Sequence, residues 1–561
     1  MKVRPIIYQL LPRLFVNFNE QCVVGGTIEQ NGSGKMNAIS TKVLKSIKGL
    51  GVTHVWYTGV IEHSHTSDYS VYGIGRHNRY ITKGAAGSPY AITDYYDIDP
   101  DIADSVPDRM SEFESLVLRT HKAGMKVLID FVPNHVSREY CSDAKPLGVS
   151  DFGAADTADA FFRPGNDFYY FPGESFFPSF YIGDGSDAYH ECPARASGND
   201  CFTPSPGIND WYETVKLNYG IDYSNGSHHF DPIPPVWYKM QEILLFWASK
   251  GVDGFRCDMA FMVPQEFWVW VIPQIKARYP EMIFIAEIYD VALYRDFIFR
   301  CGFDYLYDKV NLYDSLRAIE CNGGDASRLT NCWQTVDGIG SNMLNFLENH
   351  DEQRFASEYY AGNGDIVLPS LVVTAFMSTG PVMIYAGQEL GEKASDSEGF
   401  SGYDGRTTIF DYWSIPTVRR WLNSGKCDGK FLTDKEKELR ELYRRVLTMC
   451  NSEKALREGR FFDLMYVNYD NSTVNCRRQY FFLRHSGETT FLIGVNFDDI
   501  ACNAEIAVPC HAFEVLGIKE GVKHGVELLS GTKEDFMFSS CSPFTTRIDA
   551  HGAVVWKLTK K

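Results

Sequence analysis

Lys126-Val127-Leu128-Ile129-Asp130-Phe131 is the stretch of sequence that decides the fold, and Val132-Pro133-Asn134-His135 follows it directly. Its apolar run, interrupted only by Asp130, is typical of a strand in a parallel sheet that is covered on both faces. Before it, residues 110–123 have the apolar spacing of a helix that ends at Gly124. A buried strand preceded by such a helix predicts an α/β protein.

The same alternation extends in both directions along the chain. Helices are expected over residues 40–50, around 240–247 and over 433–450, the last beginning with the capping box Thr433-x-x-Glu436. The expected strands cover residues 6–10, 52–60, 126–131, 252–258, 283–287, 303–307, 343–347 and 382–385. Eight strands with interposed helices predict a (β/α)₈ TIM barrel.

The barrel pattern is interrupted once and is then followed by a different pattern. Residues 136–235 are rich in Gly, Pro, Asp and aromatic residues, and we expect them to form an inserted loop-rich domain after the third strand. Past residue 460, short apolar runs separated by turn residues predict a C-terminal antiparallel β-sandwich domain. The barrel is therefore expected to consist of 1–135 and 236–459, with 136–235 inserted (domain B) and 460–561 following it.

The composition is that of a globular protein with an acidic surface. Among 561 residues, 54 Lys and Arg stand against 72 Asp and Glu, which gives a net charge of −18. Because this charge repels phosphate, we expect neither nucleic acid nor a membrane as a partner. No apolar run reaches 18 residues, and no signal-peptide pattern opens the sequence. The 14 cysteines form no CxxC pair and favour a reducing compartment, so a cytoplasmic location is expected.

Four expected strands end in, or lead directly to, carboxylates: Asp130, Asp258, Glu287 and Asp351. Catalytic groups of a TIM barrel come from the C-terminal ends of its strands. A carboxylate at the end of a buried strand is costly to desolvate unless it is paired or takes part in chemistry. One such residue is explained equally well by a structural salt bridge, but four on one rim favour an active site.

Two chemistries use a rim of this kind. Metal-assisted hydrolysis would take His135, His350 and the carboxylates as ligands, but no HxH or HExxH motif stands on these strand ends. Glycoside hydrolysis needs two carboxyl groups, one as nucleophile and one as acid and then base. Arg256 favours the second chemistry, because a nearby cation keeps Asp258 ionised.

These motifs resemble the conserved segments of the α-amylase family of retaining glycoside hydrolases, in the family's order and spacing. The matching segments are 130–135 (DFVPNH), 254–258 (GFRCD), Glu287 after an apolar strand, 349–351 (NHD), 7–12 (IYQLLP), 93–96 (TDYY), 216–218 (KLN) and 384–389 (IYAGQE). The resemblance covers residues 4–460, and the β domain after them also fits the family.

The resemblance implies a catalytic role for three carboxylates. Asp258 is expected to be the nucleophile that forms a β-glucosyl-enzyme intermediate. Glu287 is expected to protonate the leaving glycosidic oxygen and then to deprotonate the incoming water. Asp351 is expected to hold hydroxyls of the distorted sugar and, as a like charge, to help keep Glu287 protonated.

The resemblance also implies four substrate-binding residues, and it assigns Asp130 a structural role in supporting Arg256 or the loop that carries His135. Tyr90 is expected to stack under the sugar ring at the cleaved bond, and His135 and His350 to bond its hydroxyls. Arg256 is expected to orient Asp258.

The departures from the family pattern bear on calcium and on specificity. Many members carry Lys-His where this chain has Phe261 and Met262, and Ser88-Pro89-Tyr90 replaces the usual His-Gly-Tyr. Asn134 fits the family's structural Ca²⁺ site, whereas residues 30–35 (QNGSGK) lack the carboxylates of a second site. We therefore expect no cofactor for the chemistry and assign no metal ligand, while a structural Ca²⁺ remains compatible with Asn134. The departures resemble the neopullulanase and maltogenic amylase members.

The sequence thus predicts a retaining hydrolase of α-1,4, and as a second candidate α-1,6, glucosidic linkages in starch-derived glucans or malto-oligosaccharides. A transglycosylase or a sucrose- or trehalose-processing enzyme is the first alternative, because sugar acceptors use the same Asp258 and Glu287. A non-catalytic sugar-binding or transporter-associated relative is the second. Such relatives typically lose the three carboxylates and gain a membrane anchor.

Overall fold

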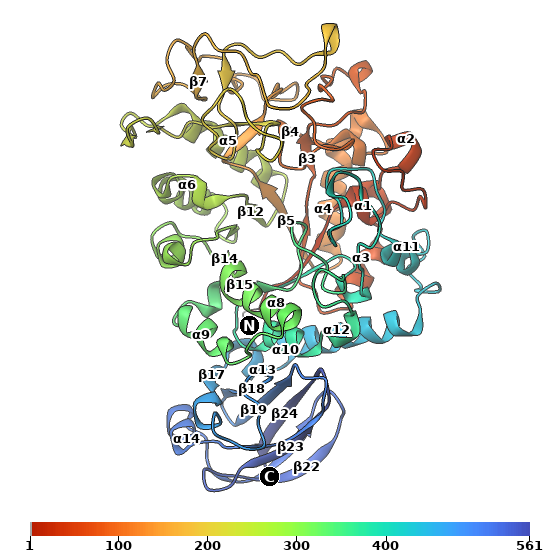
Figure 1. Ribbon diagram of the computed structural model, residues 1–561, viewed down its shortest axis with the longest axis vertical. Coiled ribbons are helices and arrows are strands. Elements are labelled where there is room, and N and C mark those ends of the chain that lie inside the picture. The colour runs from red at the N-terminus through yellow and green to blue at the C-terminus, as the bar shows by residue number, and fades with distance from the viewer. Residues whose placement is uncertain (1–2) are drawn as a thin grey trace.

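The computed structural model describes residues 3–561, and a closed barrel of eight parallel strands lies at its centre (Figure 1). The strands follow one another around the barrel in chain order, and the last returns to pair with the first. They are β1 (Ile6–Leu10), β2 (His54–Tyr57), β5 (Lys126–Phe131), β12 (Gly254–Cys257), β13 (Ile283–Ala286), β14 (Tyr305–Tyr307), β15 (Met343–Phe346) and β16 (Val382–Tyr385). The predicted TIM barrel is confirmed.

Helices cover the outside of the barrel and pack their apolar faces against it. They include α3 (Thr41–Lys48), α4 (Arg109–Lys122), α5 (Pro235–Ser249), α6 (Gln265–Arg278), α7 (Tyr294–Phe299), α8 (Asp314–Asn322), α9 (Arg328–Thr335), α10 (Leu368–Phe376) and α12 (Asp434–Ser452). Trp247 of α5 shows the packing, because its ring meets Phe113 of α4 edge-on at 5.5 Å. The expected capping box of α12 is present, with Thr433 and Glu436 bonding each other's backbone.

The strand register brings the carboxylates to one end of the barrel. Cys257 of β12 pairs with Ala286 of β13, so the next residues, Asp258 and Glu287, leave neighbouring strands side by side. Arg256 lies in the same register as Asp130 of β5. The site is therefore set by strand pairing and not by loop conformation alone.

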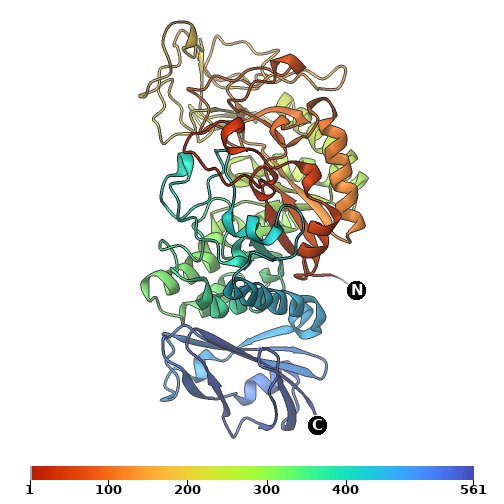
Figure 2. The same ribbon diagram turned by 90° about the vertical axis from the view of Figure 1, so that its right-hand side faces the viewer.

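Between β5 and β12 the chain leaves the barrel and forms the segment at one end of the molecule's long axis (Figures 1 and 2). Short antiparallel pairs hold it together: β6 (His135–Ser137) with β9 (Thr214–Lys216), β7 (Tyr170–Phe171) with β8 (Ala194–Arg195), and β10 (Ile221–Asp222) with β11 (Ser227–His228). A second hairpin, β3 (Ile61–His63) with β4 (Ile92–Ile98), follows β2. The β6–β9 pair joins the start of the insertion to residues near its end, and the boundaries at 136 and 235 remain predictions.

The C-terminal part lies at the opposite end of the long axis, as Figure 2 shows in blue. Its larger sheet is antiparallel and runs in the order β17 (Arg460–Asp463), β18 (Gln479–Ser486), β19 (Thr489–Asn496), β24 (Gly552–Lys560), β21 (Gly521–Glu527) and β22 (Lys533–Phe538). A second pair, β20 (Cys502–Ile506) and β23 (Phe544–Ile548), packs against it through Phe544, which lies 4.4 Å from Phe536 between ring centres. This strand-rich domain was predicted.

Two observations concern the whole described chain. Within residues 3–561, no helix combines the length and apolar character needed to cross a membrane. All 14 cysteines are free thiols, and they range from buried to exposed.

Candidate active site

A cavity of about 290 Å³ opens at the C-terminal ends of the barrel strands. Of the seven residues predicted for the site, five line it: Tyr90, His135, Asp258, Glu287 and Asp351. A larger hollow of about 1020 Å³ lies on the C-terminal domain but contains none of the predicted residues. The smaller cavity is therefore the candidate active site, and the two remaining residues lie immediately behind it.

Arg256 joins the two carboxyl groups expected to carry the chemistry. Its Nη1 donates to Asp258 Oδ1 at 2.6 Å, and its Nη2 lies 2.8 Å from Glu287 Oε1. The side chain is only 1% exposed, and its guanidinium lies over the rings of Trp56, Tyr90 and Tyr307. The carboxylates around it, Glu287 first, raise its pKa against the opposing effect of burial, so Arg256 stays charged.

One carboxylate oxygen of Asp258 accepts a hydrogen bond from Arg256, and the other oxygen is left free. Burial is the main influence on this carboxyl and raises its pKa, while the Arg256 guanidinium opposes the rise. Because Arg256 takes Oδ1, Oδ2 is the oxygen left to approach a bound sugar.

Glu287 is fixed in orientation by two donors from its surroundings. The Met259 N–H donates to Oε2 at 2.7 Å, and the Tyr289 hydroxyl donates to Oε1 at 2.5 Å. Only 2% of the residue is exposed. A carboxyl group held at both oxygens keeps its position while the groups around it react, which suits an acid and base.

Asp351 stands at the mouth of the cavity. Its side chain is 42% exposed, yet protein surrounds it closely enough that desolvation, and then the charge of Glu287, raise its pKa to about 7. Its Oδ2 lies 3.1 Å from His350 Nε2. A partly exposed carboxyl group on the lining of the cavity is placed to hold hydroxyls of a ligand there.

His350 lies behind the cavity wall and not on it. Its Nε2 is 2.5 Å from the Tyr90 hydroxyl, its Nδ1 is 2.7 Å from Gln9 Nε2, and the Tyr90 and His350 rings stack at 5.3 Å. Burial, and then the charge of Arg256, lower its pKa well below the usual value, so the ring is neutral. In this arrangement His350 fixes the Tyr90 ring, and its predicted bond to a sugar hydroxyl remains a prediction.

His135 faces the cavity beside Trp211, with the ring centres 5.2 Å apart. Burial, and then the charge of Lys216, lower its pKa to about 3. A neutral histidine both donates and accepts, which suits hydroxyl groups. Asp130 has the predicted supporting place, because it accepts from Trp56 Nε1 at 3.0 Å and lies 3.5 Å from Arg256 Nη1.

The surroundings of Asn134 do not fit a calcium ion. The ammonium group of Lys216 bonds to Asn134 Oδ1 and lies 2.7 Å from Asp200 Oδ1 and 3.3 Å from the Met262 carbonyl oxygen. Lys216 is 2% exposed. One buried cation thus already uses the oxygens that Asn134, the insertion and the loop after β12 provide. The Asn134 site therefore lacks a ligand set suited to a calcium ion.

Several cavity residues were not predicted. They are Lys83, Ser88, Trp211, Glu213, Thr214, Met259, Tyr289, Ile409 and Phe410. Residues 211–214 stand just before the matched 216–218 segment, and Tyr289 stands two residues after Glu287, so adjacency to a motif could have indicated them. Ile409 and Phe410 come from the loop after β16, well past the matched 384–389 segment, and no motif lies beside them.

The loop between β3 and β4 forms one wall of the cavity with the loop after β16. The Ala86 N–H donates to the Phe410 carbonyl at 2.9 Å, and Arg13 donates to the carbonyls of both Ala86 and Ile409. Across the cavity, Lys83 lies 3.0 Å from Glu213 of the insertion. The cavity is thus walled by three segments that are far apart in the sequence.

Comparisons with known proteins agree with this fold. The family model "Alpha amylase, catalytic domain" matches residues 9–168. Alpha-amylase MalA of Haloarcula japonica is 24% identical over 397 residues, which cover 69% of this chain and 44% of that protein. The matched part of this chain therefore spans less than half the length of that relative.

Two solved structures match over nearly the whole chain. A noncanonic maltogenic alpha-amylase, AmyB from Thermotoga neapolitana, has a TM-score of 0.62 at 19% identity, with 99% of each chain covered. CldA, described as a cyclomaltodextrin glucanotransferase with a three-domain ABC distribution, has a TM-score of 0.64 at 16% identity, with 100% of each chain covered. At these identities the likeness shows the fold alone.

The barrel with its rim of carboxylates defines the chain as a glycosidase-type TIM-barrel protein. The family model and the curated relatives support the α-amylase family as the one that this chain resembles.

Proposed function

We propose that this protein is a retaining glycoside hydrolase that cleaves α-1,4-glucosidic linkages in starch-derived glucans or malto-oligosaccharides. The observation that carries the proposal is the single guanidinium of Arg256 that contacts both Asp258 and Glu287 at the floor of a cavity. One head group bridging both carboxyls favours the short separation of about 5–5.5 Å found in retaining enzymes over the wider gap of inverting ones.

In the first step, Asp258 Oδ2 attacks the anomeric carbon of the bound sugar, and the bond to the glycosidic oxygen breaks. Glu287 gives its proton to that oxygen, so the leaving chain departs as an alcohol. In the second step, Glu287 takes a proton from water, whose oxygen attacks the same carbon and displaces Asp258. Two displacements leave the product in the α configuration of the substrate.

The remaining cavity residues position the sugar in this proposal. Tyr90 offers its ring face, and His350 holds that ring in place through the hydroxyl contact at 2.5 Å. His135 and Asp351 reach the cavity with polar atoms suited to ring hydroxyls. Hydrogen bonds from these residues to the ring hydroxyls stabilise the transition state when they strengthen as the ring flattens.

A transglycosylase is the second candidate function, and the apolar part of the cavity lining favours it. Trp211, Met259, Ile409 and Phe410 place apolar surface around the catalytic carboxyls. Such surface stacks against a sugar acceptor but offers water few hydrogen bonds. The intermediate on Asp258 would then pass to a sugar hydroxyl, with Glu287 removing the proton from that hydroxyl.

Product analysis on starch, pullulan, cyclodextrin, maltose, sucrose and trehalose tests the proposal. We expect maltose or short malto-oligosaccharides from starch or cyclodextrin, with reducing ends increasing at each cleavage. Products longer than the substrate would support the transglycosylase. Activity confined to sucrose or trehalose, or no turnover of any of the six, would contradict the proposed function.

A further inference from the structure

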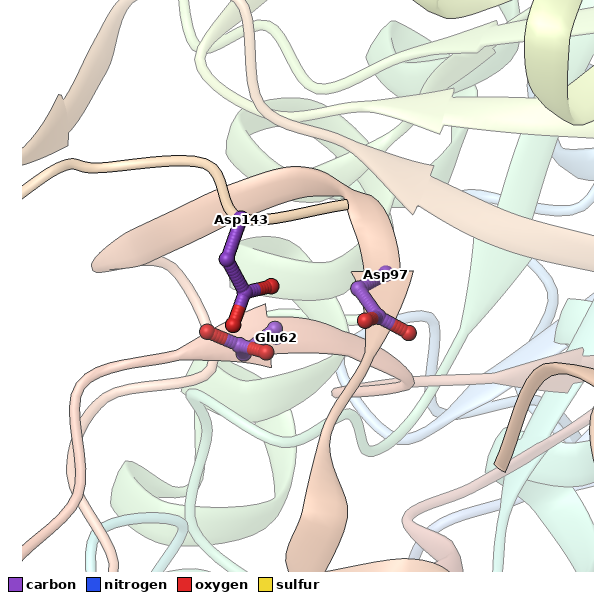
Figure 3. A group of neighbouring side chains, drawn as sticks. All are labelled: Glu62, Asp97 and Asp143. Carbon is purple, nitrogen blue, oxygen red and sulfur yellow. The ribbon is translucent and has the colours of Figure 1, made fainter. Parts of the chain in front are cut away.

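Three carboxylates from separate segments meet away from the candidate active site. Glu62 lies on β3, Asp97 on β4, and Asp143 in the insertion after β6, and their ligand oxygens lie within 4.8 Å of one another. Figure 3 shows the three side chains near one another, with Glu62 below Asp143 and Asp97 to the right of both. None of them lines the catalytic cavity.

Glu62 has an oxygen that the protein leaves without a hydrogen-bond partner. The residue is 3% exposed, its Oε1 accepts from Thr93 Oγ1 at 3.2 Å, and its Oε2 is buried and unbonded. A buried carboxylate oxygen without a donor is energetically unfavourable, because it has lost its water and gained no partner. A proton on this oxygen, or a cation beside it, would compensate for the missing hydrogen-bond donor.

The negative charge around Glu62 exceeds the positive charge available. Burial, and then Asp94, Asp97 and Asp143, raise the pKa of Glu62 to about 9. Arg109 pairs with Asp97 through Oδ2, and the Asp94 oxygens accept the Ser142 hydroxyl and the N–H groups of Asp143 and Ala144. Among the ion pairs of the described residues, Arg109 is the cation bonded to this group of carboxyls, while the nearby Lys145 pairs with Asp151.

We propose that Glu62, Asp97 and Asp143 bind one hard divalent cation of the Ca²⁺ type, which ties the insertion to the β3–β4 hairpin. Carboxylate oxygens are the ligands such ions prefer, and Ca²⁺ bonds of 2.3–2.6 Å place opposite ligands about 5 Å apart. Asp143 is exposed, so the ion has a way in from solvent, and water completes its coordination. This site is separate from the oxygens that Lys216 occupies, and it does not depend on the catalytic proposal.

Calorimetric titration of the full chain tests this, after metal is removed with EDTA and the chelator is dialysed away. With CaCl₂ alone, we expect one saturable site per chain, with a Kd of about 1 mM or tighter. A parallel titration with MgCl₂ is expected to show weaker binding, because Mg²⁺ demands shorter bonds in an octahedron. We also expect Ca²⁺ to raise the Tm and to slow proteolysis within residues 138–150.

Two variants locate the site. Asp143→Asn changes an exposed side chain and is expected to fold and to weaken Ca²⁺ binding at least tenfold, and Glu62→Gln is expected to do the same. Asp187→Asn, which makes the same change on an exposed aspartate of the insertion, is expected to bind as the original chain does. Absence of saturable binding in the unmodified chain up to about 10 mM Ca²⁺ would overturn the proposal. So would unchanged affinity in Asp143→Asn.

Discussion

Asp258→Asn is expected to lower the turnover of a malto-oligosaccharide by roughly 10⁴-fold or more. The amide is a poor nucleophile, so the covalent intermediate does not form, and Arg256 loses a charged partner at 2.6 Å. Binding should survive, because Tyr90, His135 and Asp351 still line the cavity. Steady-state kinetics give the loss of turnover, and titration of the variant with the same oligosaccharide gives its affinity.

Two controls make this result interpretable. Asp187→Asn alters an exposed aspartate in the same way and is expected to keep the original turnover. A melting curve of Asp258→Asn shows whether the barrel is intact. Turnover within tenfold of the original in a folded Asp258→Asn chain would contradict the assignment of the nucleophile. It would also favour a chemistry that needs no covalent step.

Glu287→Gln is expected to slow oligosaccharide hydrolysis by about 10²–10⁴-fold, the usual contribution of a general acid and base. The first step should recover with α-glucosyl fluoride, because fluoride leaves without needing a proton. A rapid release of fluoride should then be followed by a slow phase, since water has lost its base. Added azide needs no base, so it should speed this phase and give α-glucosyl azide.

The matched change Glu320→Gln, on a half-buried glutamate of α8 that accepts from Ser370 Oγ, is expected to keep turnover on both substrates. Equal losses of turnover on the oligosaccharide and on the fluoride in Glu287→Gln would contradict the acid role. They would show that Glu287 does not assist the leaving group. Failure of azide to speed the slow phase would contradict the base role.

Much of the fold could be predicted, because parallel strands that are buried on both faces have nearly continuous apolar sequences. Each of the eight runs became a barrel strand, and β5 is the clearest example, with five of its six residues buried. The positions of Asp258 and Glu287 follow from the same runs. Each stands one residue past the end of a strand, and strand register then brings them together.

The walls of the cavity could not be predicted, because they depend on contacts between distant loops. Phe410 is held beside the site by a bond from the Ala86 N–H to its carbonyl, and Ala86 stands over 300 residues earlier in the chain. The cluster of Glu62, Asp97 and Asp143 could not be predicted either, because it also depends on contacts between separate segments. The β3–β4 pairing shifts register on both sides of Glu62, and alternation in the sequence does not reveal such irregularities. Lys216 was noted as part of a motif, but its place between Asn134 and Asp200 needed the fold.

The most direct test of the central claim follows the anomeric proton of the first product by NMR, on a time scale faster than mutarotation. An α-linked malto-oligosaccharide is mixed with enough enzyme to complete hydrolysis within a few minutes. The account predicts that the α-anomer appears first and that the β-anomer grows only as the sugar equilibrates, because two displacements at Asp258 restore the starting configuration. Initial release of the β-anomer would mean one direct displacement by water, and it would contradict the covalent mechanism.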